Sequence, residues 1–149
     1  MRPILKIIFV LLVCTLFIGN INAQGQFGLK TGLGIDPGQF VIGGQVELTK
    51  GLGIFHLIPN LELGLGSTSG LYFNVNFVAM FRAERSSFGL YLGGAPTLAL
   101  SEFDDLGLGL NAIVGTQLRF IRKVPTNLEL RIGIGDKIPD FRILLTFLL

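Results

Sequence analysis

Residues 71–82 constrain the fold of this chain more than any other stretch, because apolar and polar side chains alternate along them. In a β-strand successive side chains point to opposite faces, so an alternation of period two predicts a strand with two unlike faces. One face is wholly apolar and consists of Leu71, Phe73, Val75, Phe77, Ala79 and Phe81. The other face has Tyr72, Asn74, Asn76 and Arg82 together with Val78 and Met80. Such a strand needs two different environments.

The same alternation recurs in seven further stretches, which are separated by Gly, Pro, Asp, Ser or Lys residues typical of turns. These stretches are residues 27–36, 39–49, 54–66, 88–100, 106–120, 127–136 and 141–149. Most of them reach the roughly 9–11 residues that a tilted strand needs to cross a bilayer. The apolar face contains no charged residue in any of the eight, and the charged strand residues all fall on the other face. We therefore predict eight strands.

The first 23 residues have the features of a cleavable signal peptide: Arg2 and Lys6, an apolar run over residues 7–18, and a small residue at Ala23. The apolar run is shorter than the roughly 20 residues of a membrane-spanning helix. The only cysteine of the sequence, Cys14, lies inside it. We expect a mature chain of one domain, residues 24–149, without a disulfide.

The charge balance argues against nucleic acid as a partner. Removal of Arg2 and Lys6 with the leader lowers the 12 basic residues to 10, against 10 acidic residues. The sequence has no basic stripe with interleaved aromatic residues. Its Gly-x-Gly spacings belong to expected strands and precede no expected helix, so they do not indicate a nucleotide loop. We expect no nucleic acid, no metal and no cofactor.

Alternation alone also fits a secreted soluble β-barrel or sandwich that binds an apolar ligand. The polar face distinguishes such a soluble fold from a barrel that spans a membrane. It is rich in glycine, as at Gly32, Gly34, Gly107 and Gly109. Glycine weakens an exposed strand but suits the crowded inside of a narrow closed barrel. An apolar outside, a polar inside and an even strand number predict an eight-stranded antiparallel up-and-down transmembrane β-barrel after a cleavable signal peptide.

In this pattern, and in its Gly-Leu-Gly-Leu-Gly type strands, the chain resembles the small eight-stranded outer-membrane barrels of Gram-negative bacteria, the OmpA/OmpX-type and opacity-type proteins. The resemblance covers nearly all of residues 24–149. It implies an outer-membrane location, contact with the lipid bilayer, and insertion by the barrel-assembly machinery; we expect a monomer. Two features depart from the family: the sequence ends in Leu148-Leu149 instead of an aromatic residue, and it has no Trp. Tyr72 and Tyr91 fall on the inner face, so an aromatic girdle must be made of Phe or be absent.

The inner face is predicted to contain a salt-bridged polar network in the lumen. Its expected members are Lys30, Glu47, His56, Glu62, Arg82, Arg119, Glu129 and Arg131. Simple turn registers place Glu47 opposite His56, Lys30 diagonal to Glu47, and Arg119 opposite Glu129. Opposite charges in such pairs lower the free-energy cost of burial.

With both chain ends on the periplasmic side, as the family implies, the paired glycines collect in the outer half of the lumen. We predict that they form an outer cup with Tyr72, Asn74 and Asn111 that is open to the outside. Such a cup could bind or conduct a small molecule. The other interpretation is that the glycines only permit strand curvature.

His56 is the only histidine, so enzyme hypotheses depend on it. Thr49 is the only hydroxyl expected near it, and we expect a structural hydrogen bond to Glu47 and no catalysis. The expected connections are short, which argues against a large protein-binding crown. Acidic outer loops could contact lipopolysaccharide through divalent cations or simply be solvated. The expected function is a non-enzymatic role in envelope structure or surface interaction.

Two prolines, Pro59 and Pro96, fall within strands on the apolar face, where each removes a backbone donor. A local bulge is one interpretation. A sideways opening for an apolar solute is the other.

Overall fold

The computed structural model describes residues 25–48, 53–82, 88–102, 104–121 and 124–149, without the side chains of residues 82 and 119–121. The predicted signal peptide, residues 1–23, lies outside this part of the chain. No helix among the described residues is long and apolar enough to cross a bilayer.

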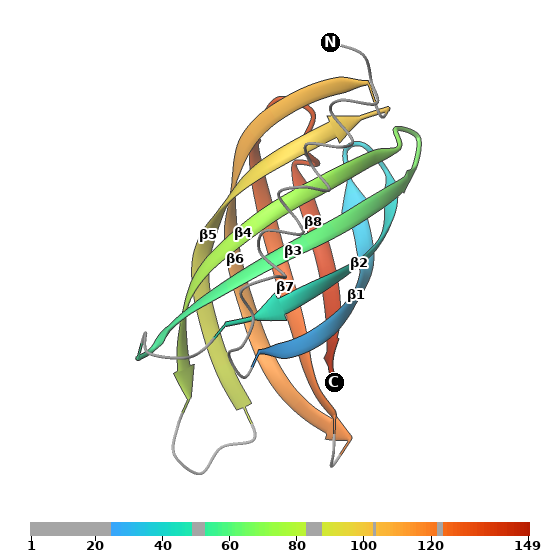
Figure 1. Ribbon diagram of the computed structural model, residues 1–149. Coiled ribbons are helices and arrows are strands. Elements are labelled where there is room, and N and C mark those ends of the chain that lie inside the picture. Colours follow the sequence, from blue (N-terminus) through green and yellow to red (C-terminus); the bar gives the residue numbers. More distant parts are fainter. Residues whose placement is uncertain (1–24, 49–52, 83–87, 103, 122–123) are drawn as a thin grey trace.

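Eight antiparallel strands form a closed barrel in which each strand pairs with the next and the first pairs with the last (Figure 1). They are β1 (Gln26–Ile35), β2 (Gln39–Glu47), β3 (Phe55–Gly66), β4 (Gly70–Arg82), β5 (Phe88–Ser101), β6 (Asp105–Ile121), β7 (Val124–Gly135) and β8 (Phe141–Leu148). All eight predicted strands are confirmed. The start of β7 differs most from the prediction, because pairing with β6 continues to Ile121 and Val124 beside the turn.

The barrel has two distinct ends. The end with the turns after β1, β3, β5 and β7 is called the loop end. The end where β1 begins and β8 finishes, with the turns after β2, β4 and β6, is called the terminal end. The predicted orientation would place the loop end outside the cell.

The outer face is apolar, as predicted for a barrel in lipid. Leu108 is 70% exposed and Phe27 is 58% exposed, whereas the Arg131 and Arg142 side chains on the inner face are completely buried. A soluble sheet would bury its leucines and phenylalanines in the centre of the molecule. The fold is therefore a transmembrane β-barrel.

Exposed phenylalanines concentrate near the terminal end. They are Phe27 on β1, Phe55 on β3, Phe81 on β4, Phe88 on β5 and Phe147 on β8. The ring of Phe55 also stacks on that of Phe77, with ring centroids 5.4 Å apart. This end of the barrel thus has an aromatic girdle made of Phe.

Neither strand proline causes a bulge, so the bulge prediction is wrong. Pro59 lies opposite Val75 in an unbroken β3–β4 register, and Pro96 lies opposite Leu110 in an unbroken β5–β6 register. On the other side of each proline the ladder is interrupted: the β2–β3 pairing ends at Asn60, and the β4–β5 pairing passes from Thr97 to Gly94 without a change of register. The missing donors therefore interrupt the ladder without inserting an extra residue. The register shift that the barrel does have lies between β6 and β7, at Leu118 and Ile121.

The inside of the barrel has apolar as well as polar parts. One apolar cluster consists of Ile58, Val78, Met80, Tyr91, Ala95 and Ile113, from strands β3 to β6. A smaller one consists of Tyr72, Ala99 and Ile138 and lies near the loop end. The polar side chains between and beside these clusters form the candidate site.

Candidate functional site

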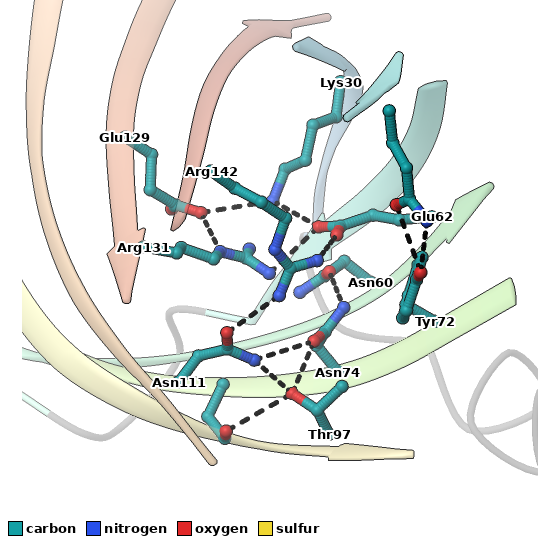
Figure 2. A network of polar contacts seen from close by, with 12 residues as sticks. Lys30, Asn60, Glu62, Tyr72, Asn74, Thr97, Asn111, Glu129, Arg131 and Arg142 are labelled. Carbon is teal, nitrogen blue, oxygen red and sulfur yellow. Dashed lines mark hydrogen bonds and ion pairs between the residues drawn. The ribbon is translucent and has the colours of Figure 1, made fainter. Parts of the chain in front are cut away.

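The centre of the lumen is a buried charge cluster around Glu62 of β3 (Figure 2). The Glu62 carboxylate lies 2.7 Å from Nη1 of Arg142, 3.0 Å from Nη1 of Arg131 and 3.4 Å from Nζ of Lys30. All four side chains are completely buried. The alternation of β1, β3, β7 and β8 turns these residues inward, and barrel closure brings β1, β7 and β8 opposite β3.

A second carboxylate, Glu129 of β7, completes this cluster. It accepts a hydrogen bond from Nε of Arg131 and one of 3.1 Å from the Tyr91 hydroxyl, and it lies 3.6 Å from Nζ of Lys30. The cluster of Lys30, Glu62, Glu129, Arg131 and Arg142 therefore places three cations around two carboxylates. The shared contacts offset part of the cost of removing these charges from water.

A layer of amide side chains extends the cluster toward β4, β5 and β6. Arg142 donates from Nη2 to Oδ1 of Asn111 over 2.8 Å, and Asn111 donates to the Thr97 hydroxyl. Thr97 donates to Oδ1 of Asn74 over 2.7 Å, and Asn74 donates to Oδ1 of Asn60 over 3.0 Å. The chain of bonds ends where Asn60 donates to Oδ1 of Asn76 over 2.9 Å.

Tyr72 links the cluster to β2. Its ring lies 5.5 Å from the guanidinium carbon of Arg142, and its hydroxyl accepts a 2.9 Å hydrogen bond from Nε2 of Gln39. We call the connected set the lumen network. Its members are Lys30, Gln39, Asn60, Glu62, Tyr72, Asn74, Asn76, Tyr91, Thr97, Asn111, Glu129, Arg131 and Arg142, and every strand contributes at least one. The network cross-links the barrel wall across its whole circumference.

The predicted polar residues separate into three groups. Lys30, Glu62, Glu129 and Arg131 lie together in the lumen network. Glu47 and His56 form the predicted pair nearer the terminal end, with Oε1 of Glu47 2.8 Å from Nδ1 of His56. The two residues are diagonal and not directly opposite as predicted, because Leu48 lies opposite Leu57. The side chains of Arg82 and Arg119 lie outside the described part of the structure.

Two of the predicted pairings are wrong. The residue opposite Glu129 is Gly115, so Arg119 is not its cross-strand partner. Lys30 lies beside Glu62 and Glu129 instead of pairing with Glu47. In both cases a sequence register built from simple turns misses contacts that cross the barrel.

The predicted open cup is also wrong. Tyr72, Asn74 and Asn111 do point inward, but at most 2% of each is exposed. The loop between β7 and β8 fills the space above them: Ile138 is 4% exposed and packs against Tyr72 and Ala99, and Pro139 is buried beside it. We call residues 136–140 the stopper.

The paired glycines make room for the stopper. A Cβ atom at Gly109 would overlap Cδ1 of Ile138, and one at Gly133 would lie 2.5 Å from the carbonyl oxygen of Pro139. Asp140 donates its backbone N–H to the carbonyl of Asp36 over 3.1 Å, and an ion pair joins Lys137 to Asp105. These glycines therefore receive a loop of the same chain.

Sequence reasoning missed the stopper residue Ile138 and six members of the lumen network, namely Gln39, Asn60, Asn76, Tyr91, Thr97 and Arg142. Arg142 was placed on the inner face but not in the site, although it contacts Glu62, Asn111 and Tyr72. Arg142 lies directly opposite Arg131, and two neighbouring buried cations require an acidic residue close by. This pairing could have indicated the role of Arg142, but it cannot be recognised without the register between β7 and β8. Ile138 lies in a loop, where no periodicity indicates that a side chain is buried.

The contact between Glu47 and Nδ1 of His56 orients the imidazole ring in the inner half of the lumen near the terminal end. Thr49, the hydroxyl that the sequence placed nearby, lies outside the described residues.

Comparisons with known proteins agree with this fold. No protein-family model matches the chain, and no curated protein matches its sequence. Among solved structures, the Neisserial surface protein A (NspA) is similar over 84% of this chain and 94% of its own, with 10% identity and a TM-score of 0.58. A de novo designed transmembrane β-barrel is similar over 86% and 98%, with 11% identity and a TM-score of 0.55. The outer membrane enzyme PagL is similar over 83% and 98%, with 11% identity and a TM-score of 0.52. The chain has the eight-stranded fold of outer-membrane barrels.

Proposed function

We propose that this outer-membrane barrel is a non-enzymatic and non-conducting component of the bacterial envelope, with a role in envelope structure or surface interaction. The observation that supports this most is the lumen network, in which side chains from all eight strands meet across the interior. Water and ions need a continuous polar path, and here charged and amide side chains contact one another across the interior. The stopper adds an apolar closure at the loop end.

Conductance measurement tests the closed lumen. Residues 24–149, refolded and placed in a planar lipid bilayer, should give no discrete current steps, whereas a water-filled porin in the same bilayer should. A matched variant, Arg142→Gly with Tyr72→Ala, removes two large side chains from the network and should raise the frequency of current steps if it folds. Steady steps from the unaltered protein would contradict the proposal.

The absence of catalysis is tested separately, because the fold also supports an enzyme in PagL. Vesicles of phospholipid and lipopolysaccharide incubated with the refolded barrel should show the same lipid masses before and after incubation. His56→Ala serves as the matched control. A mass change that the wild-type protein produces and His56→Ala does not would show that the barrel is an enzyme.

The role in the envelope is tested in cells. A deletion strain should become more sensitive to bile salts and to large antibiotics that an intact outer membrane excludes. The wild-type gene and the His56→Ala gene should restore resistance equally. Unchanged sensitivity of the deletion strain would count against a structural role and favour surface interaction.

A further inference from the structure

The apolar outer wall of the barrel differs in height between its two sides. β5 and β6 have 14 and 17 residues, whereas β1, β2 and β8 have 10, 9 and 8. Figure 1 shows β5 and β6 running over nearly the full height of the barrel and β1, β2 and β8 over less of it. We call the outer face of β8, β1 and β2 the short wall and that of β5 and β6 the tall wall.

The lipid-facing residues define the extent of each wall. On the short wall they run from Phe27 to Ile35 along β1, and both of these residues are more than half exposed. On the tall wall they run from Leu106, which is 51% exposed, to Leu118 along β6, and the register places Phe88 of β5, which is 44% exposed, beside Leu118. The lipid-facing surface is therefore apolar on both sides but unequal in length.

Strand geometry converts these spans into heights. A rise of ~3.4 Å per residue and a tilt of ~40° give a height of ~21 Å for residues 27–35 and ~31 Å for residues 106–118. The apolar band of outer-membrane barrels is ~25 Å tall. Tilting the whole barrel can level one rim but cannot make the two walls equal.

Charged residues lie directly beyond the short wall. Asp36 follows Ile35, Asp140 precedes β8, and both are exposed at the loop end. A flat bilayer as thick as the tall wall would place one rim of the short wall in hydrocarbon. Burial of polar rim groups costs more free energy than a local change in bilayer thickness, whose cost per ångström of mismatch is modest.

We propose that the short wall thins the bilayer beside it, so that lipid is thinner along β8, β1 and β2 than along β5 and β6. The partner of this surface is thus a phospholipid layer with disordered or short acyl chains. This inference goes beyond the proposed function, because a barrel with an open lumen would have the same walls.

Depth measurements with single cysteines test the proposal, since residues 24–149 contain no cysteine. Phe27→Cys and Ile35→Cys mark the two rims of the short wall, and Phe88→Cys and Leu106→Cys mark those of the tall wall. Each variant is labelled with a small fluorophore in vesicles of 18-carbon phosphatidylcholine, and quenching by lipids brominated at different depths locates the label. Thr31→Cys and Ala112→Cys, at the middle of the two walls, should both lie near the bilayer centre.

Thinning predicts that all four rim labels lie close to the headgroups. A bilayer of uniform thickness predicts that at least one short-wall label lies ~5 Å or more deeper than its tall-wall counterpart, and this result would overturn the proposal. Heat-modifiable gel mobility confirms that each variant is folded. Leu33→Cys and Leu108→Cys replace Ile35→Cys and Leu106→Cys if either does not fold, and Leu29→Cys and Leu90→Cys replace Phe27→Cys and Phe88→Cys.

Discussion

The lumen holds two acidic sites that differ in depth and in the number of their partners. Glu62 lies in the centre, completely buried, and contacts Lys30, Arg131 and Arg142. Glu47 lies nearer the terminal end and contacts His56, whose side chain is 15% exposed. Both residues are carboxylates on the inner face of neighbouring strands. Their different numbers of partners therefore arise from their positions along the barrel axis.

The comparison indicates that the number of charged partners follows the position of the carboxylate along the barrel axis. A carboxylate in the dry centre of a barrel loses nearly all its hydration, and a single cation does not offset that loss. Glu62 meets three cations, two of them arginines, which remain protonated and donate from several N–H groups. Glu47 is buried as well, with 4% of the residue exposed, but the partner described for it, His56, is partly exposed and lies toward the rim.

The largest expected effect is that of Glu62→Gln, which preserves shape and removes the charge. Lys30, Arg131 and Arg142 would then share Glu129 alone within the cluster, so buried cations would lack compensation. We expect the free energy of unfolding to fall by about 3–5 kcal/mol. Urea titration in lipid vesicles, followed by gel mobility without boiling, measures it. A loss equal to that of Glu47→Gln would remove the distinction between the two sites.

A double-mutant cycle sharpens the comparison. Arg142→Gln removes one cation and keeps a group that can bond to Asn111. Because Arg142 and Glu62 are 2.7 Å apart, the double variant should lose less stability than the two single losses added together, with a coupling of about 2–3 kcal/mol. Unfolding of the four proteins under one condition gives this value. Additive losses would show that Arg142 acts through Asn111 and Tyr72 instead.

The sequence predicted the barrel well because its wall follows one local rule. Alternation sets which face each residue occupies, and that rule alone placed Lys30, Glu62 and Arg131 inside. Contacts across the lumen follow from closure and shear, which no local pattern records, so the pairings of Lys30 and Arg119 were mispredicted. The glycines were recognised as a space near the loop end, but the residue that fills it, Ile138, belongs to a loop without periodicity.

A middle-sized effect is expected at the stopper. Ile138→Ala would leave a cavity over Tyr72 and Ala99, and we expect a loss of about 2 kcal/mol, at the low end for a buried Ile because a loop can partly relax. Ile134→Ala is the matched control, since that side chain faces lipid and is 71% exposed. The same unfolding assay applies. Equal effects at both positions would mean that the loop end is not packed like a core.

The smallest effect is expected at the terminal-end pair. Glu47→Gln keeps a hydrogen-bonding group toward His56 and removes a carboxylate that contacts one ionisable side chain among the described residues, where Glu62 contacts three. We expect a loss of about 1 kcal/mol in the same assay. His56→Gln should give a similar value, because it breaks the same contact from the other side. A loss above 3 kcal/mol for either variant would place this pair in the same energetic class as Glu62.

The pairing of β1 with β8 governs how the barrel can assemble. Arg142 arrives on the eighth strand, and β8 aligns with β1 from Gly28 beside Leu148 to Ile35 beside Phe141. Before that strand joins, Glu62 lacks one of its three partners and both β1 and β7 have an unsatisfied edge. Such distant pairing carries a high loop-closure cost and slows folding. The contact between Arg142 and Glu62 and the closure of the barrel therefore form in the same late step of folding. A chain arrested before that step would expose the edges of an open sheet, which is prone to aggregate.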